Sequence, residues 1–380
     1  MIAVRRNLPD LFRRNAAFIA GEESDRPLVG IHVWERQYRR MYRETNRTIP
    51  ENGQVRPQDI HTDLFLTDVD RLLAMNERIG GDLFWPVVSY VYIPWMEAII
   101  GCPVHAIENS FYANPCMESW GDFDADLDAA ESPWLAKLLE LHRALLREFG
   151  DAYPIASSSH LRGPVDMMAA ALGQTRLPLE FYDNPDRVQT MCAAYSRVFV
   201  EVATRQNRLS AEARFGGFTV NGYGVWTPRP CQYLQDDGMA FLSPDIYRRF
   251  IVRDHRGIAR NFDSIFYHVH PVSLFIVDEL LTFENLRILE INREPEAIGP
   301  SLRELLPVFR RTQESGKALL VNFTQGAVGI ERFEEEVALL CDELPYRGLC
   351  LYVMADDEDD GMRRMDIIRA VLRRRGAAVP

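Results

Sequence analysis

The sequence is short of positive charge and of any organised cysteine pattern, and each shortage excludes a class of protein. Its 380 residues carry 43 Lys+Arg against 55 Asp+Glu, which gives a formal charge of −12. Because nucleic acid and anionic membranes bind to basic surfaces, this balance argues against both as partners. The six cysteines include no C-x-x-C pair and no short repeated spacing. A disulfide framework and a tetrathiolate zinc site are therefore not expected.

Long apolar runs are missing as well. The longest, at 90–102, is interrupted by Pro94 and Glu97 and falls short of the roughly 18 apolar residues that a membrane span requires. The N-terminus has charges every few residues and lacks the apolar core of a secretory signal. The hydrophobic fraction of 47% is that of an ordinary globular protein. We expect a cytoplasmic protein that uses neither a membrane nor a nucleic acid as partner.

What the sequence does contain is an alternation of strand-like and helix-like segments over its whole length. Predicted strands, rich in β-branched and aromatic residues, lie at 27–33, 82–90, 153–159, 214–221, 264–270, 286–292, 317–323 and 348–354. Helix start signals stand between them, such as Ser243 before a proline and the Ser301/Glu304 capping box. This order predicts an α/β protein with a single (β/α)8 TIM barrel over 1–380, with a helical extension at 1–25.

Two features qualify this prediction. The polar stretches 40–67 and 102–133 exceed the bare repeat and are expected to form long loops at the active-site face. A doubly wound open sheet is the alternative fold, but it would carry a glycine-rich turn after its first strand. Residues 34–37, which follow that strand, contain no glycine.

Polar residues at the carboxyl ends of barrel strands are the candidates for chemistry. We expect catalytic roles for Arg36, His160, Asn221 and Tyr223. We expect substrate contacts from Trp34, Arg40, Tyr90, Arg162, Asn292 and Asn322. The arginines after the first strand could clamp an anionic group of a substrate, or could lie on a solvated helix with ion pairs such as Arg40 with Glu44.

The segment YHVHP at 267–271 is the strongest single motif. Residues two apart on a strand point to the same side, so His268 and His270 would project together and form part of a site for zinc or another divalent metal. Asp356, which follows the last predicted strand, is the expected third ligand. The alternative is that one histidine packs inside the barrel while the other caps a loop.

Three further segments resemble the uroporphyrinogen decarboxylase superfamily, whose barrel also houses corrinoid-linked methyltransferases. They are GPVDMM at 163–168, FYDNPDRV at 181–188 and DDGMAFLSPDIY at 236–247, followed at the usual distance by His268 and His270. The resemblance runs over most of 150–355. It implies a barrel enzyme acting on a small molecule, with a homodimer as the expected assembly.

Departures from the family patterns favour one branch. The segment 86–94 has no carboxylate where the decarboxylases carry an aspartate. The methyltransferase branch binds zinc through H-x-C and a later cysteine. Here His268 matches the histidine, His270 replaces the first cysteine, and Asp356 is the candidate for the second. A thiolate site would thus become a harder nitrogen and oxygen site.

The leading hypothesis is therefore a metal-dependent, methyltransferase-like enzyme that activates a small substrate for methyl transfer to or from a corrinoid, with a corrinoid protein as a potential partner. A metal-independent decarboxylase of a polycarboxylated, tetrapyrrole-like substrate is the second hypothesis, with Arg36, Arg40 and Arg162 gripping carboxylates. A barrel that binds a corrinoid or tetrapyrrole without turnover is the third.

Overall fold

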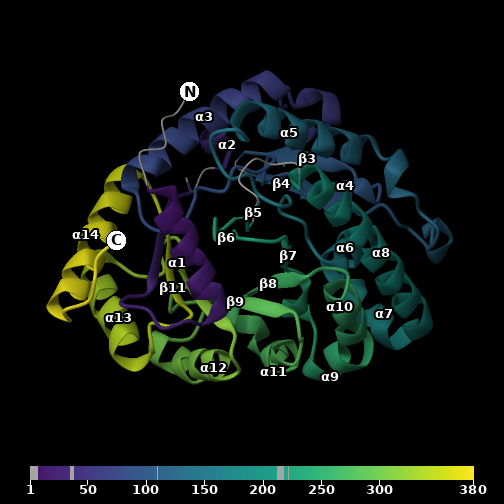
Figure 1. The fold of residues 1–380 in the computed structure, drawn as a ribbon. Helices are drawn as coiled ribbons and strands as arrows, with labels where there is room; N and C mark the ends of the chain where they lie inside the picture. Colours follow the sequence, from purple (N-terminus) through teal and green to yellow (C-terminus); the bar gives the residue numbers. More distant parts are fainter. Residues whose placement is uncertain (1–6, 35–37, 109, 212–217, 221) are drawn as a thin grey trace.

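A curled sheet of six parallel strands forms one side of the molecule (Figure 1). The computed structural model describes residues 7–380 apart from 35–37, 109, 212–217 and 221. In sheet order the strands are β1 (Leu28–Val33), β11 (Leu349–Ala355), β10 (Ala318–Phe323), β9 (Leu286–Arg293), β8 (Ser264–Val269) and β7 (Cys231–Leu234). Every neighbouring pair is parallel, so all the carboxyl ends meet at one rim.

The opposite side of the barrel is irregular, and the prediction of eight regular strands is not met there. Segments 82–90 and 153–159 contribute only isolated parallel bridges, Val87 with Ile155 and Ala156 with Thr219. Pro86 and Pro154 lie inside these segments and cannot donate to a ladder. Within the fourth predicted strand, 214–221, the described part contains the short strand β5 (Phe218–Thr219). It pairs with β6 (Trp226–Thr227) in a short hairpin.

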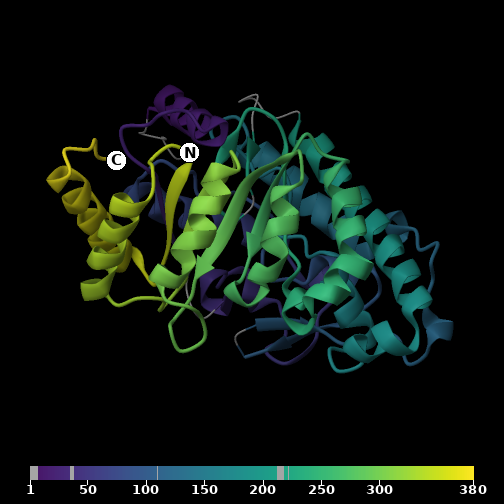
Figure 2. The same ribbon diagram turned by 90° about the horizontal axis from the view of Figure 1, so that it is seen from below.

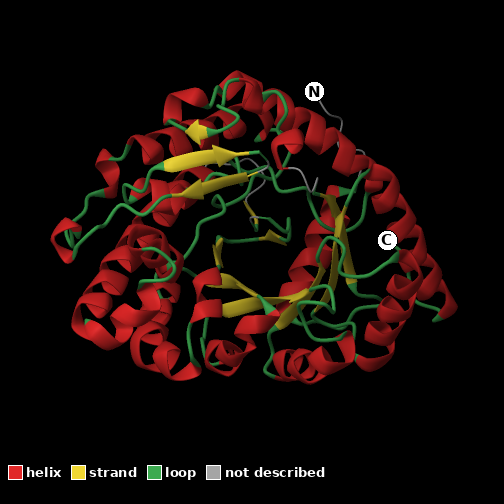
Figure 3. Cartoon of the chain, turned by 180° about the vertical axis from the view of Figure 1, so that it is seen from behind, coloured by secondary structure: helices red, strands yellow, loops and turns green. Residues whose placement is uncertain are grey.

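The helices surround the strands, most of them in an outer ring (Figure 3), and several cover the outer face of the sheet (Figure 2). They are α1 (Leu8–Ala20), α2 (Tyr38–Met41), α3 (Thr62–Ile79), α4 (Trp95–Ile99), α5 (Pro133–Phe149), α6 (Pro164–Leu172), α7 (Leu177–Asp183), α8 (Pro185–Ser210), α9 (Pro244–Ile246), α10 (Val252–Ala259), α11 (Val277–Leu281), α12 (Leu302–Glu314), α13 (Ile330–Glu343) and α14 (Glu358–Arg374). The predicted start signals are confirmed, since Ser243 caps α9 and Ser301 with Glu304 forms the capping box of α12.

The interior of the half-barrel changes from apolar to polar along the strands. Near the strand starts, an apolar cluster includes Leu28, Ile288 and Cys350, all buried. Toward the carboxyl ends, the register sets His268 opposite Glu290 and Asn322 opposite Asn292. Because these strands are parallel and share one rim, polar side chains from different strands gather at one end of the barrel.

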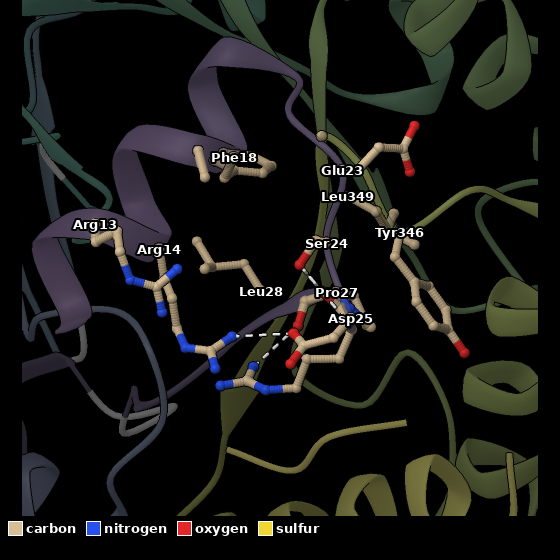
Figure 4. Close-up of a pocket in the computed structure, with 13 residues that line it drawn as sticks. Arg13, Arg14, Phe18, Glu23, Ser24, Asp25, Pro27, Leu28, Tyr346 and Leu349 are labelled. Carbon is tan, nitrogen blue, oxygen red and sulfur yellow. Dashed lines mark hydrogen bonds and ion pairs between the residues drawn. The ribbon is translucent and has the colours of Figure 1, made fainter. Parts of the chain in front are cut away.

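Helix α1 packs against the other end. Its Phe18 belongs to the interior apolar cluster, and Asn15 Nδ2 donates to the carbonyl of Asp82 at 2.9 Å. A small cavity of about 170 Å³ lies between α1 and the starts of β1 and β11 (Figure 4). Its charged groups pair within the protein, since Arg14 lies 3.2 Å from Asp25 and Arg26 makes two hydrogen bonds to Asp82.

The two predicted long loops carry a small antiparallel sheet of their own. It consists of β2 (Gly53–Gln54), β3 (Val104–Ile107) and β4 (Ser110–Ala113). The β3–β4 hairpin brings Ser110 and Phe111 to the polar end of the barrel, where they line the larger cavity described below. Among the described residues, no helix is both long and apolar enough to span a membrane.

Candidate active site

A cavity of about 450 Å³ opens at the carboxyl ends of the strands. Eight residues predicted from the sequence line it: Trp34, His160, Arg162, Tyr223, His268, His270, Asn292 and Asn322. Residues that the sequence did not single out line it too, chiefly Tyr233, Gln235, Asp237 and Tyr352. Most of the predicted site residues thus lie together around one cavity. The role of each residue stays a prediction.

Two histidines and one carboxylate converge in this cavity. His268 is the second-last residue of β8 and His270 follows the strand, and both present Nε2 toward Asp237, which begins the short helical turn after β7. Asp237 Oδ1 lies 3.8 Å from His268 Nε2 and 3.5 Å from His270 Nε2. One ligand atom from each of the three residues lies within 4.8 Å of the others. Imidazole nitrogens with a carboxylate oxygen make a donor set suited to a divalent metal ion.

A carboxylate holds the Nδ1 side of each imidazole ring. The Nδ1 atom of His268 hydrogen-bonds to Glu290, which is fully buried on β9. His270 Nδ1 lies 2.5 Å from Glu294 Oε1. A carboxylate on Nδ1 fixes the tautomer of a histidine and leaves Nε2 to the metal, which is the arrangement that metal-binding histidines typically adopt.

Asp237 is positioned by the segment that follows the third predicted strand. The backbone amides of Asp237 and Gly238 donate to the carboxylate of Asp166, at 3.0 and 2.7 Å. In return, the side chain of Asp236 accepts from the amides of Val165 and Asp166. The GPVD and DDG motifs are therefore held together by these hydrogen bonds, which we call the clamp. The clamp places Asp237 beside the two histidines.

The charges of the site are strongly coupled. Burial alone would raise the pKa of Asp237, but the hydrogen bond from His270 and the charges of His268, His270 and Arg162 outweigh burial and hold this pKa well below its usual range. Burial opposes the charged form of His270 too, yet Asp237 and Glu294 raise its pKa to about 10. The pKa of His160 falls to about 4, because of burial and then the nearby charge of Arg162. His160 is thus a neutral group near pH 7.

The structure places the predicted third ligand elsewhere. Asp356 is exposed at the end of β11, and its backbone amide donates to Asp360 at 3.2 Å. The acidic run 356–360 starts helix α14, with the side chain of Asp357 capping its first turn, where negative charge is stabilised. Among the described residues, Asp237 takes the position beside the histidines that was expected of Asp356.

Two other predicted residues, Arg40 and Tyr90, are not among the described residues that line the cavity. Arg40 is exposed on α2. Tyr90 is buried among aromatic rings, and its hydroxyl donates to Asn46 at 2.9 Å. Arg162, in contrast, lines the cavity, and its guanidinium is paired with Glu97 at 3.0 Å. Predictions for Arg36 and Asn221 fall outside the described residues.

Amide and hydroxyl groups complete the walls. Asn322 Nδ2 donates to Asn292 at 2.7 Å, and Asn292 Nδ2 lies 3.1 Å from Nδ1 of His270. Asn322 Oδ1 is buried and accepts no hydrogen bond from the described residues. On the neighbouring strand β11, the hydroxyl of Tyr352 accepts a hydrogen bond from Trp34 Nε1 at 2.9 Å. The cavity thus offers polar contacts on aromatic walls.

Comparison with known proteins supports the fold. No family profile and no curated protein sequence matches the chain. A solved structure of a methyltransferase from Methanosarcina mazei is similar over 97% of this chain and 99% of that chain, with a TM-score of 0.63 and 13% sequence identity. At this identity the similarity shows a shared overall fold.

Proposed function

We propose that this protein is a metal-dependent, methyltransferase-like enzyme of the uroporphyrinogen decarboxylase superfamily, built on a (β/α)8 barrel whose second and third strands are irregular. The observation that carries the proposal is the convergence of His268, His270 and Asp237 at the carboxyl rim of the sheet. The full-length similarity to a protein named as a methyltransferase supports it, as do the motifs at 163–168 and 236–247.

The donor set fits a divalent metal and favours oxygen ligands. His268, His270 and Asp237 would hold the ion through two nitrogens and one oxygen, a harder set than a thiolate site. When bound, zinc or a similar ion would supply Lewis acidity to a substrate oxygen such as a hydroxyl or carboxylate. Three protein ligands would leave one position of a tetrahedral site for that substrate.

The surrounding residues would hold the substrate and the ligands in place. Glu290 and Glu294 keep the imidazoles oriented, so the site is formed before substrate enters. Asn292 and Asn322 line the cavity and would supply polar contacts to the substrate. The rings of Tyr223 and Tyr352 supply apolar surface that excludes water from the reacting group.

Methyl transfer to or from a corrinoid, free or carried by a partner protein, is the reaction that the family resemblance adds. The decarboxylase alternative has less support, because it relies on free arginines. Arg40 is exposed and is not among the described residues that line the cavity, and Arg162 is already paired with Glu97. No observation favours the third hypothesis, a corrinoid- or tetrapyrrole-binding barrel without turnover.

Metal analysis tests the proposal. After exhaustive chelation and reloading with zinc, the wild type should retain about one equivalent, whereas His268→Ala, His270→Ala and Asp237→Asn should retain far less. Asp356→Asn is the matched control, since that carboxylate is exposed outside the cluster, and it should retain wild-type zinc. A wild type that binds no metal, or an Asp237→Asn variant that binds normally while Asp356→Asn does not, would refute this ligand set.

Reaction of the zinc-loaded wild type with cob(I)alamin and oxygen-linked methyl donors tests the chemistry separately. Formation of methylcobalamin, followed by its visible spectrum, is expected for the wild type and not for His270→Ala. Zinc binding without methyl transfer from any donor would leave the metal site standing and remove the methyltransferase assignment.

A further inference from the structure

Two cysteines meet at the base of the hairpin that lines one side of the cavity. Cys102 precedes β3 and Cys116 follows β4, and their sulfur atoms lie 3.4 Å apart. Both are free thiols. Neither belongs to the site described above.

The hairpin itself brings the two residues together. Its antiparallel pairing begins with Val104 opposite Ala113, and Asn114 N donates to Pro103 O at 2.8 Å just beyond that pair. The next positions along each strand lead to the cysteines. Closing the 3.4 Å gap to the ~2.05 Å of a disulfide requires only a small adjustment of the side chains.

The two thiols differ in a way that suits stepwise oxidation. Cys102 is buried, with 1% of its surface exposed, whereas Cys116 is only partly buried. The Cys102 thiol donates its hydrogen bond to the Cys116 sulfur, and this bond lowers the pKa of Cys116. The same hydrogen bond, together with burial, raises the pKa of Cys102. Cys116 is thus the sulfur that a reagent reaches and the one that ionises first.

We propose that Cys102 and Cys116 are a reversible redox site, oxidised by small-molecule disulfides to an intramolecular disulfide that staples the base of the β3–β4 hairpin. In the first step the Cys116 thiolate attacks one sulfur of the reagent, forms a mixed disulfide and releases one thiolate. Cys102 then loses its proton and attacks Cys116 Sγ, which releases the second thiolate. Overall, two protein thiols and one disulfide yield the protein disulfide and two small thiols.

The staple would act on the cavity through two contacts. Ser110 and Phe111 of the same hairpin line the cavity wall. On the other side, the amide of Cys102 donates to the carbonyl of Glu97 at 2.9 Å, and the carboxylate of Glu97 pairs with Arg162. Oxidation would therefore stiffen the wall that these residues form.

Thiol counting after treatment with oxidised glutathione tests the site. Native full-length wild type should lose two of the six thiols of the reduced chain, and peptide mapping should join Cys102 to Cys116. Dithiothreitol should restore all six. Cys102→Ser should stop at a glutathione adduct on Cys116, and Cys116→Ser should form neither product. Cys341→Ser, which alters another partly buried thiol, should still form the disulfide.

Retention of all six thiols, or a disulfide between other cysteines, would overturn the assignment. Hydrogen exchange of 104–113 tests the staple, because amide exchange there should slow on oxidation of the wild type and not of Cys116→Ser. Unchanged exchange in the oxidised wild type would refute an effect on the hairpin.

Discussion

Replacing Glu290 by glutamine tests how the histidines are oriented. Glu290 is fully buried and hydrogen-bonds to Nδ1 of His268. Glutamine has nearly the same shape, so the fold should survive, but a neutral amide holds the Nδ1 proton less strongly and lowers the basicity of the ring. Loss of such a supporting carboxylate typically weakens metal affinity about 10–100-fold. That range corresponds to roughly 1.4–2.7 kcal/mol of binding free energy.

The assay is competition between the protein and a chromophoric zinc chelator, with circular dichroism to confirm folding. Glu296→Gln is the control, since Glu296 is paired with the exposed Arg332 and touches neither histidine. We expect the zinc dissociation constant to rise about 10–100-fold for Glu290→Gln and to stay within about twofold of wild type for Glu296→Gln. A folded Glu290→Gln variant with wild-type affinity would refute the role assigned to this carboxylate.

Three further predictions concern stability and the clamp around Asp237. Arg26→Met leaves the charge of Asp82 buried and without its partner. The free energy of unfolding from urea denaturation should therefore fall by about 3–5 kcal/mol. A decrease of less than about 1 kcal/mol would contradict a stabilising role for this ion pair. Burial lowers the pKa of His142 from 6.5 to about 4, so the unfolded chain binds this proton more tightly than the folded protein does. The free energy of unfolding should therefore fall by up to about 3 kcal/mol as the pH drops from 6.5 to 4. The free energy of unfolding of His142→Gln should depend less on pH across this window, and an unchanged slope would count against a neutral buried imidazole. In Gly163→Ala the new methyl group would lie 2.5 Å from the Asp236 carboxylate, so zinc retention should drop, and full retention would show that the clamp does not position the site.

Strands were predictable where the chain has a short, continuous run of mainly apolar residues. Runs such as 317–323 and 348–354 form sheet strands close to the expected bounds. The segments around Pro86 and Pro154 were also predicted as strands, but each proline lacks an amide hydrogen and they form only isolated bridges. β7 was missed because it has only four residues and follows a proline-rich turn.

The residues of the candidate site were predictable only where they lie on a predicted strand with a clear spacing. His268 and His270 were predictable because a two-residue spacing on a strand places both side chains on one face. The third candidate ligand, Asp237, follows β7, a strand that the sequence pattern does not indicate, and so the sequence pointed to Asp356. The supporting carboxylates come from β9 and the loop after it, and only the register of β8 with β9 shows that Glu290 meets His268.

X-ray absorption spectroscopy of the zinc-loaded protein tests the central claim most directly. The account predicts a first shell of nitrogen and oxygen at about 2.0–2.1 Å, with imidazole scattering from two histidines and no sulfur at about 2.3 Å. In Asp237→Asn the shell should change, and in Asp356→Asn it should not. A sulfur shell in the wild type would contradict this ligand set. A spectrum that changes in Asp356→Asn but not in Asp237→Asn would contradict it as well.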